Sequence, residues 1–315
     1  MIRLFLASVS LLLIRSVEVL ENGLARTPPM GWMSWRYYMC TTDCVKHPSK
    51  CLDEGLIMSV ADAFYTEGYK EAGYQYVILD DCWSENERDA DGRLVANKQR
   101  FPRGMKFLAD YIHARGLKFG LYIGIGSITC MGFPGSKWYL EEDAQQFADW
   151  EVDYIKVDAC FVTFDMNTCN LWRNFHDLVI GTASVTEGEN RVQMAVWSML
   201  SAPFLISCPM TLITPYEKKL LQNPDLIAIA QDPLGIMATP FQLSETVTLW
   251  VKRHLPMRGD IYHSFSFAAV NFGNSSTYNI FERYFVKNIT SFADNIDEIV
   301  PAHGELFPIM TARRP

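Results

Sequence analysis

The sequence predicts an α/β protein: a (β/α)8 barrel of the TIM type that lacks some central strands, followed by a small antiparallel β-sandwich domain. From about residue 28 to residue 235, strand-like and helix-like segments alternate with short links, which is typical of a parallel sheet. A helical segment accompanies nearly every strand, which favours a barrel over an open doubly wound sheet. After residue 235, strand-like segments follow one another without helices, which indicates an antiparallel domain.

The N-terminal segment has the pattern of a secretory signal peptide. Arg3 precedes the apolar run LFLASVSLLLI, which is too short to span a bilayer. We therefore expect residues 1–19 to be a signal peptide, residues 20–237 the barrel domain and residues 238–315 the β-sandwich domain. The expected location is the secretory pathway or beyond it, without insertion into a membrane.

The composition of the chain indicates which partners, cellular compartment and cofactors to expect. The formal net charge of −8 and the absence of a long basic run argue against nucleic acid. Eight cysteines fit an oxidising compartment, and Asn274 and Asn288 lie in glycosylation sequons. Because neither the cysteines nor the six histidines show metal-ligand spacing, we expect no metal and no cofactor.

The elements of the predicted barrel can be placed in chain order. Strands are expected at residues 30–35, 74–81, 117–126, 152–160 and 202–207, and helices at residues 59–73, 104–116 and 141–150. The spacing between residues 160 and 202 is too short for the further strands that a closed eight-stranded barrel needs. The sequence therefore predicts a barrel with strands missing from this interval.

Two charged residues on the strand at residues 152–160 raise the question of function. Lys156 and Asp158 lie two positions apart, so they share one face, and Ile155 and Val157 are expected to point into packing on the other. A buried charged side chain needs an oppositely charged partner or a functional role, because burying an unpaired charge costs several kcal/mol. The pair is either a structural ion pair or part of an active site at the carboxyl end of a parallel strand.

A resemblance to a known family is carried by seven stretches: NGLARTPPMGWMSW (22–35), ILDDCW (78–83), RFPRGMKFLADYIHARGLKFGLY (100–122), CMGFPGS (130–136), DYIKVDAC (153–160), CNLWRNF (169–175) and QDPLG (231–235). Together they resemble the animal lysosomal α-galactosidase and α-N-acetylgalactosaminidase branch of glycoside hydrolase family 27. The resemblance implies a retaining exo-glycosidase that removes terminal α-linked galactose or N-acetylgalactosamine from glycolipids, glycoproteins or oligosaccharides. It also implies a homodimer.

The resemblance assigns roles to individual residues. It makes Asp158 the nucleophile, with Lys156 on the same face expected to hold its carboxylate ionised. It makes Asp177 either the acid/base or a sugar-binding residue, and we take it as the acid/base. The implied substrate-binding residues are Trp35, Asp80, Asp81, Tyr122, Lys156 and Arg173, and the implied disulfides are Cys40–Cys82, Cys44–Cys51 and Cys130–Cys160.

The sequence departs from the family pattern at two places. Blocks of residues are missing between Cys160 and Cys169 and again after WRNF (172–175), so HDLVIG (176–181) joins the start of one family segment to the end of another. The alternative interpretation is therefore a catalytically impaired product, a truncated isoform or an incorrectly joined gene prediction, that binds galactosides weakly at most. A Cys169–Cys208 bond is a further pairing that these gaps leave open.

Overall fold

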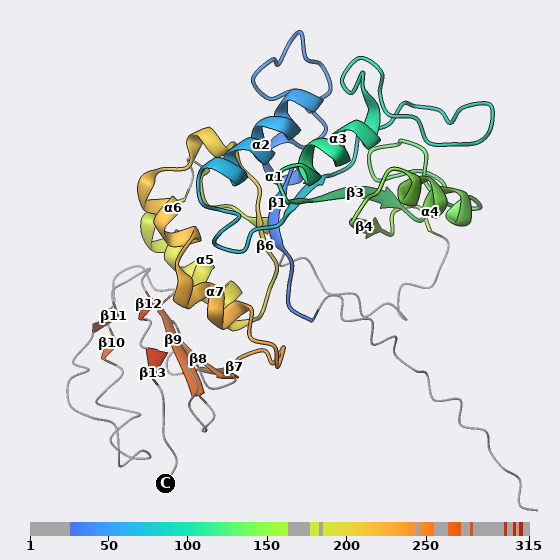
Figure 1. Cartoon of the computed structure of the whole chain (residues 1–315). Coiled ribbons are helices and arrows are strands. Elements are labelled where there is room, and N and C mark those ends of the chain that lie inside the picture. Colours follow the sequence, from blue (N-terminus) through green and yellow to red (C-terminus); the bar gives the residue numbers. More distant parts are fainter. Residues whose placement is uncertain are drawn as a thin grey trace, which may run out of the picture.

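Two large sheets organise the described chain, and a separate pair of strands forms a third, two-stranded sheet (Figure 1). The computed structural model describes residues 26–162, 177–182, 185–242, 245 and 247–254, and the short strands beyond them given below. The predicted signal peptide, Arg173, Cys169 and both sequons lie outside the described residues. No helix within the described ranges combines the length and the apolar character needed to cross a membrane.

The parallel sheet has six strands in the order β4-β3-β2-β1-β6-β5 and curls into a half-barrel. Its strands are β1 (Met30–Met33), β2 (Tyr76–Leu79), β3 (Lys118–Gly124), β4 (Tyr154–Asp158), β5 (Asp177–Leu178) and β6 (Phe204–Ile206). Strand–helix alternation was predicted for this part of the chain, and the sheet confirms it. Between β4 and β5 no further strand is described, so the described sheet is two strands short of an eight-stranded barrel.

Helices cover the outer side of the half-barrel (Figure 1). They are α1 (Trp35–Tyr38), α2 (Glu54–Thr66), α3 (Gly104–His113), α4 (Leu140–Asp149), α5 (Glu187–Met199), α6 (Pro215–Leu221) and α7 (Pro224–Ala230), with a short 3-10 turn at Met210–Leu212. The predicted helix at residues 59–73 is wrong at both ends. It begins at Glu54 because the Asp53 carboxylate accepts a hydrogen bond from Leu56 N at 2.8 Å, and it ends before Gly68, whose φ is +81°.

Alternating side chains separate the two faces of the sheet. Outward residues such as Trp32, Val77 and Phe119 are fully buried in the main hydrophobic core between sheet and helices. Inward residues form a smaller cluster of Met33, Ile78 and Leu205. Gly31 is required where β1 meets β2, because a Cβ there would lie 2.2 Å from the carbonyl oxygen of Tyr76.

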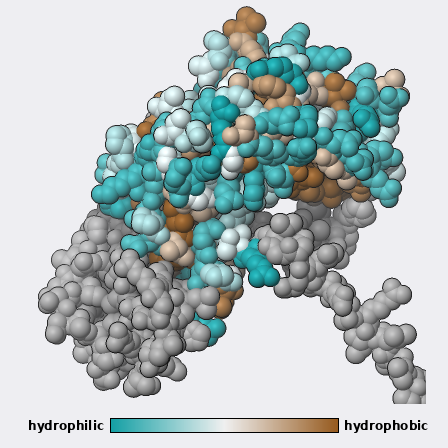
Figure 2. Space-filling view, viewed as in Figure 1, coloured by the Kyte–Doolittle hydropathy of each residue, from teal (hydrophilic) through white to brown (hydrophobic). Residues whose placement is uncertain are grey.

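The outer face of β4 does not follow this pattern. Ile155 and Val157 were expected to point into packing, and this expectation is wrong: their exposed fractions are 37% and 58%. Within the described residues, no helix contacts that face in the way that α3 contacts β3. Hydrophobic surface is visible along the lower edge of the upper body in Figure 2, where Figure 1 places β4, on a face that is otherwise mainly hydrophilic.

The second sheet is antiparallel, as predicted for the C-terminal part. It runs in the order β12-β9-β8-β7, and β13 also pairs with β9. Its strands are β7 (Thr239–Gln242), β8 (Val247–His254), β9 (Ser264–Asn271), β12 (Glu305–Leu306) and β13 (Ile309–Met310), and β10 (Tyr278–Asn279) pairs separately with β11 (Ile299–Val300). Helix α5 contacts β8, β9 and β12 as well as α6 and α7, so it lies between the two sheets.

Candidate active site

Polar side chains gather where β2, β3 and β4 end. Tyr122 and Lys156 are direct partners across the β3–β4 ladder, and Asp158 lies opposite Gly124 two positions further on. Asp80 and Asp81 follow the last residue of β2. Since the carboxyl ends of parallel strands meet at one edge of the sheet, these residues form a single site.

Lys156 is paired with Asp80, and this corrects the sequence prediction that it would hold Asp158. The Lys156 Nζ lies 2.6 Å from Asp80 Oδ2, across the intervening strand β3. Asp80 is 1% exposed, and burial raises the pKa of its carboxyl group, although the charge of Lys156 and its hydrogen bond act in the opposite direction. Ser34 Oγ accepts a hydrogen bond from Asp80 N at 2.9 Å, a contact that sequence reasoning missed.

Asp158 is held by different groups. The Tyr122 hydroxyl donates a hydrogen bond to Asp158 Oδ2 at 3.1 Å, and Ala159 N donates to Oδ1 at 2.8 Å. Burial and the nearby carboxylates Asp81 and Asp158 raise the pKa of Tyr122, so its hydroxyl keeps its proton and acts as a donor. Asp158 itself is half-buried at the end of β4.

Asp81 organises the loop after β3. Its Oδ1 accepts from Cys82 N at 2.7 Å and its Oδ2 from Met131 N at 3.1 Å. Burial raises the pKa of this carboxyl group, and the charge of Asp158 adds to the shift, whereas the backbone hydrogen bonds oppose it. Asp80 and Asp81 are thus both buried, and each has its own partners.

Two aromatic rings flank the Lys156 ammonium. Its Nζ lies 5.4 Å from the ring centroid of Tyr122 and 5.9 Å from that of Trp35, the first residue of α1. An ammonium within about 6 Å of an aromatic face is attracted by the ring quadrupole. The structure therefore brings together Trp35, Asp80, Asp81, Tyr122, Lys156 and Asp158 out of the predicted site residues.

Asp177 lies on the opposite flank of the sheet. It is the first residue of β5 and pairs with Leu205, in the same row of the ladder as Gly31 and Tyr76. This row is near the amino ends of the strands. The negative charge of Asp177 contributes to the raised pKa of Asp80, so the two carboxyl groups interact electrostatically. Its role as acid/base stays a prediction.

Three disulfides lie within the described residues, and two of them, Cys40–Cys82 and Cys130–Cys160, involve residues beside the candidate site. The pairings Cys40–Cys82, Cys44–Cys51 and Cys130–Cys160 that the resemblance implies are all present. Cys130–Cys160 joins the loop after β3 to the end of β4, two residues beyond Asp158. Cys208, at the end of β6, is a buried free thiol, and burial raises its pKa to about 12.

Comparisons with known proteins show the family of the chain. The family described as alpha galactosidase A matches residues 27–175 and 163–232. Human alpha-galactosidase A is 35% identical over 315 residues, covering 75% of this chain and 73% of the human protein. The alpha-N-acetylgalactosaminidase of Gallus gallus is 37% identical over 296 residues, covering 69% of this chain and 73% of its own length.

Solved structures share the fold. Alpha-galactosidase I from Mortierella vinacea has a TM-score of 0.76 at 24% identity, covering 91% of this chain and 97% of its own. The alpha-galactosidase MEL1 of Saccharomyces cerevisiae has a TM-score of 0.74 at 22% identity, covering 91% of this chain and 98% of its own. The chain therefore belongs to the alpha-galactosidase A family of O-glycosyl hydrolases, glycoside hydrolase family 27.

Proposed function

We propose that this chain is a retaining exo-glycosidase of terminal α-linked galactose or N-acetylgalactosamine, with Asp158 as its nucleophile. The observation that carries the proposal is the position of Asp158. The residue is half-buried at the carboxyl end of β4, its carboxylate accepts a hydrogen bond from the Tyr122 hydroxyl at 3.1 Å, and it lies beside the Asp80–Lys156 pair. This is where a parallel barrel carries catalytic side chains.

The reaction would proceed in two displacements. Asp158 attacks the anomeric carbon and forms a glycosyl ester, while a second carboxyl group protonates the departing glycosidic oxygen. Water then cleaves the ester, with the second group acting as a base. We assign the second role to Asp177 by the family resemblance, and the recognition of sugar hydroxyls to Asp80, Asp81 and Lys156, whose charged oxygens and ammonium suit hydrogen bonding.

The cellular setting follows the same proposal. Three disulfides within the described residues are typical of a protein that folds in an oxidising compartment. We therefore propose a location in the secretory pathway, lysosomal or secreted, and a homodimeric assembly as the family resemblance implies. The substrates are glycolipids, glycoproteins or oligosaccharides that end in an α-galactoside.

A second candidate function is galactoside binding with little or no turnover, as expected of a truncated isoform. The position of Asp177 favours it. Asp177 lies in the row of Gly31 and Tyr76, whereas Tyr122 and Lys156 lie four residues nearer the carboxyl ends. Two-carboxylate catalysis depends strongly on placement, since a displacement of about 1 Å can cost on the order of a hundredfold in rate.

Covalent labelling tests the assignment of Asp158. A galactose-configured cyclophellitol epoxide alkylates a nucleophilic carboxylate, so digestion and mass spectrometry should find the label on Asp158 and no label in Asp158→Asn. Hydrolysis of 4-nitrophenyl α-galactoside at acidic pH is measured in parallel on the purified chain and on Asp177→Asn.

The two functions predict different results. Labelling with turnover that Asp177→Asn abolishes supports the hydrolase. Galactose binding by calorimetry without turnover supports the binding protein. A label on another carboxylate, or turnover within tenfold of the original in Asp158→Asn, would show that Asp158 is not the nucleophile.

A further inference from the structure

A disulfide lies directly against the carboxylate of Asp158. Cys130 Sγ is 3.2 Å from Asp158 Oδ2, and the Tyr122 hydroxyl lies 3.3 Å from the same sulfur. One ligand atom from each of Cys130, Asp158 and Cys160 lies within 4.8 Å of the other two. All three residues are partly exposed, so solvent molecules and ions reach them.

This arrangement has the donor set of a thiophilic cation site once the sulfur–sulfur bond is open. Thiolates bind Zn²⁺ at about 2.3 Å and carboxylate oxygens at about 2.0–2.2 Å, so tetrahedral ligand atoms lie roughly 3.5–4 Å apart. Two sulfurs and one carboxylate oxygen supply three such positions and leave the fourth for water. Sequence spacing did not indicate the site because 30 residues separate the two cysteines.

The backbone would hold the three ligands together without the disulfide. Ile125 N donates to the carbonyl oxygen of Asp158 at 2.9 Å, and Ser136 N donates to that of Gly124 at 2.8 Å. Met131 N, next to Cys130, is bound by the Asp81 carboxylate. Gly126 allows the closest approach, because a Cβ there would lie 2.0 Å from the carbonyl oxygen of Cys160. These contacts fix the loop after β3 against the end of β4 independently of the sulfur atoms.

The local charge also favours a cation. Asp81 and Asp158 are close enough for each to influence the same tyrosine, Tyr122. The ammonium of Lys156, on the same strand as Asp158, is already paired with Asp80 at 2.6 Å. Opening the disulfide adds two thiols to this negatively charged region, and they become thiolates when they bind a cation. A divalent cation would neutralise the charge of the two thiolates.

We propose that Cys130, Cys160 and Asp158 form a binding site for a thiophilic divalent cation, such as Zn²⁺, when the Cys130–Cys160 bond is reduced. A dithiol reductant supplies two electrons and two protons, closes to its own cyclic disulfide and leaves two cysteine thiols. The cation then displaces both thiol protons to solvent and is held by two thiolates and one carboxylate. If Asp158 is the nucleophile as proposed above, the bound cation occupies it, so oxidation would be required for catalysis.

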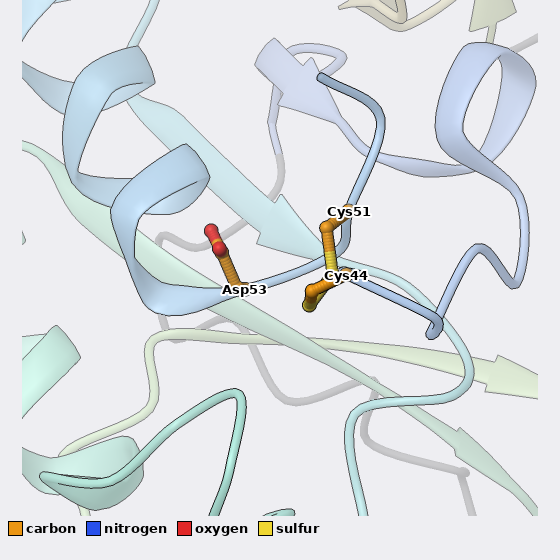
Figure 3. Close-up of side chains that lie close together, drawn as sticks. All are labelled: Cys44, Cys51 and Asp53. Atoms are coloured by element: carbon orange, nitrogen blue, oxygen red, sulfur yellow. A yellow bond between two sulfur atoms is a disulfide. The ribbon is translucent and has the colours of Figure 1, made fainter. Parts of the chain in front are cut away.

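A second cluster in the same chain provides a matched control. Cys44, Cys51 and Asp53 also have ligand atoms within 4.8 Å of one another. Figure 3 shows the Asp53 carboxylate turned toward the first turn of α2, where its Oδ1 caps Leu56 N at 2.8 Å. The positive end of the helix dipole opposes a cation there. This cluster therefore should not form the site.

Cadmium binding tests the proposal on the full chain. The protein is reduced with dithiothreitol, separated from reductant by gel filtration without oxygen, and titrated with Cd²⁺ while the ultraviolet thiolate-to-cadmium absorption is recorded. We expect one tightly bound Cd²⁺ per chain after reduction and none before it. The Cys44→Ser/Cys51→Ser variant should bind as tightly, the Cys130→Ser/Cys160→Ser variant should lose the site, and Asp158→Asn should bind at least tenfold more weakly.

Several results would overturn the proposal. The first is an affinity for Cd²⁺ in Asp158→Asn equal to that of the original protein. The second is a tight Cd²⁺ site that remains in Cys130→Ser/Cys160→Ser, and the third is a site that is lost in Cys44→Ser/Cys51→Ser. Loss of the near-ultraviolet circular dichroism on reduction would also overturn it, because the site requires a folded reduced chain. None of these readouts depends on turnover, so failure of the hydrolase assignment is distinguished from failure of the cation site.

Discussion

At the scale of single residues, the Asp80–Lys156 pair is the clearest feature of the site. Asp80 is almost inaccessible, and removing a carboxylate from water raises its pKa. The Lys156 ammonium at 2.6 Å compensates for part of this cost. The strand pattern predicted that Lys156 and Asp158 share a face, but it could not predict the partner of Lys156, because Asp80 lies two strands away in the sheet.

Replacing Lys156 by Met should raise the pKa of Asp80 further, because both the favourable charge and the hydrogen bond are lost. Because the pKa of Asp80 is higher in the folded chain than in the unfolded chain, Asp80 ionises first in the unfolded chain as pH rises. Between these two pKa values the free energy of unfolding should therefore fall with pH. The fall should be larger in Lys156→Met than in the original protein. The carboxyl ¹³C shift of Asp80, assigned with Asp80→Asn, measures the pKa directly. Lys156→Arg keeps the charge and serves as the control, and an unchanged pKa in Lys156→Met would contradict the pairing.

At the scale of elements, strands β3 and β4 differ although they are neighbours in register. Leu121 on β3 is fully buried under the helices, and Ile155, its partner on β4, is 37% exposed. The difference lies in what covers each strand, since α3 packs on β3. Hydrophobic periodicity predicted the same apolar face for both strands. It gives the direction of a side chain and says nothing about whether another element covers it.

The pair Leu121 and Ile155 gives a direct test of this difference. Leu121→Ala should lower the free energy of unfolding by about 2–5 kcal/mol, because it removes packed methyl groups and leaves a cavity. Ile155→Ala should change it by less than about 1 kcal/mol, since an exposed side chain loses few contacts. Urea denaturation of both variants measures the two values. Equal losses would mean that the outer face of β4 is covered.

At the scale of the whole molecule, one buried lysine joins the antiparallel sheet to helices α5 and α7. Lys252 on β8 is inaccessible, and its Nζ donates hydrogen bonds to Ser198 O at 3.1 Å, Ser201 Oγ at 2.7 Å and Ile229 O at 2.5 Å. The two carbonyl groups belong to the last turns of α5 and α7, where the helix dipoles favour a cation. Burial nevertheless lowers the pKa of Lys252 to about 8.

The lowered pKa predicts a pH dependence of stability. Below about pH 8 the lysine is charged in both states and the full cost of its burial is present. As pH rises from about 8 toward the higher pKa that Lys252 has in the unfolded chain, the lysine in the folded chain has already lost its proton. The cost of burying its charge therefore declines. The free energy of unfolding of the original protein, relative to Lys252→Met, should therefore rise between about pH 8 and pH 10. Urea denaturation at several pH values measures it, and Lys252→Arg, which stays charged there, should show no such rise. A constant difference would contradict burial of a titrating lysine.

The sequence predicted some features of the molecule well for physical reasons. The order of strands and helices follows from periodicity, and the placement of Asp80, Asp81, Tyr122 and Asp158 at one edge follows from parallel strands. The start of α2 was missed because Asp53 lies outside the apolar pattern. The burial of Lys252 could not be predicted, because its partners come from α5 and α7, in a different part of the fold.

The position of β1 in the sheet determines when the sheet can be completed during synthesis. Strand β1 pairs with β2 on one side and with β6 on the other, and residues 204–206 of β6 are translated long after residues 30–33. Strands β1 to β4 can pair in the order in which they leave the ribosome. One edge of β1 stays unpaired until β6 has been synthesised. The Trp32 indole, which donates a hydrogen bond to Cys208 O at 2.8 Å in the folded chain, also lacks its partner until then. Such late, long-range pairing slows folding and leaves an unpaired edge open to other chains, so the nascent protein is expected to need a chaperone during that interval.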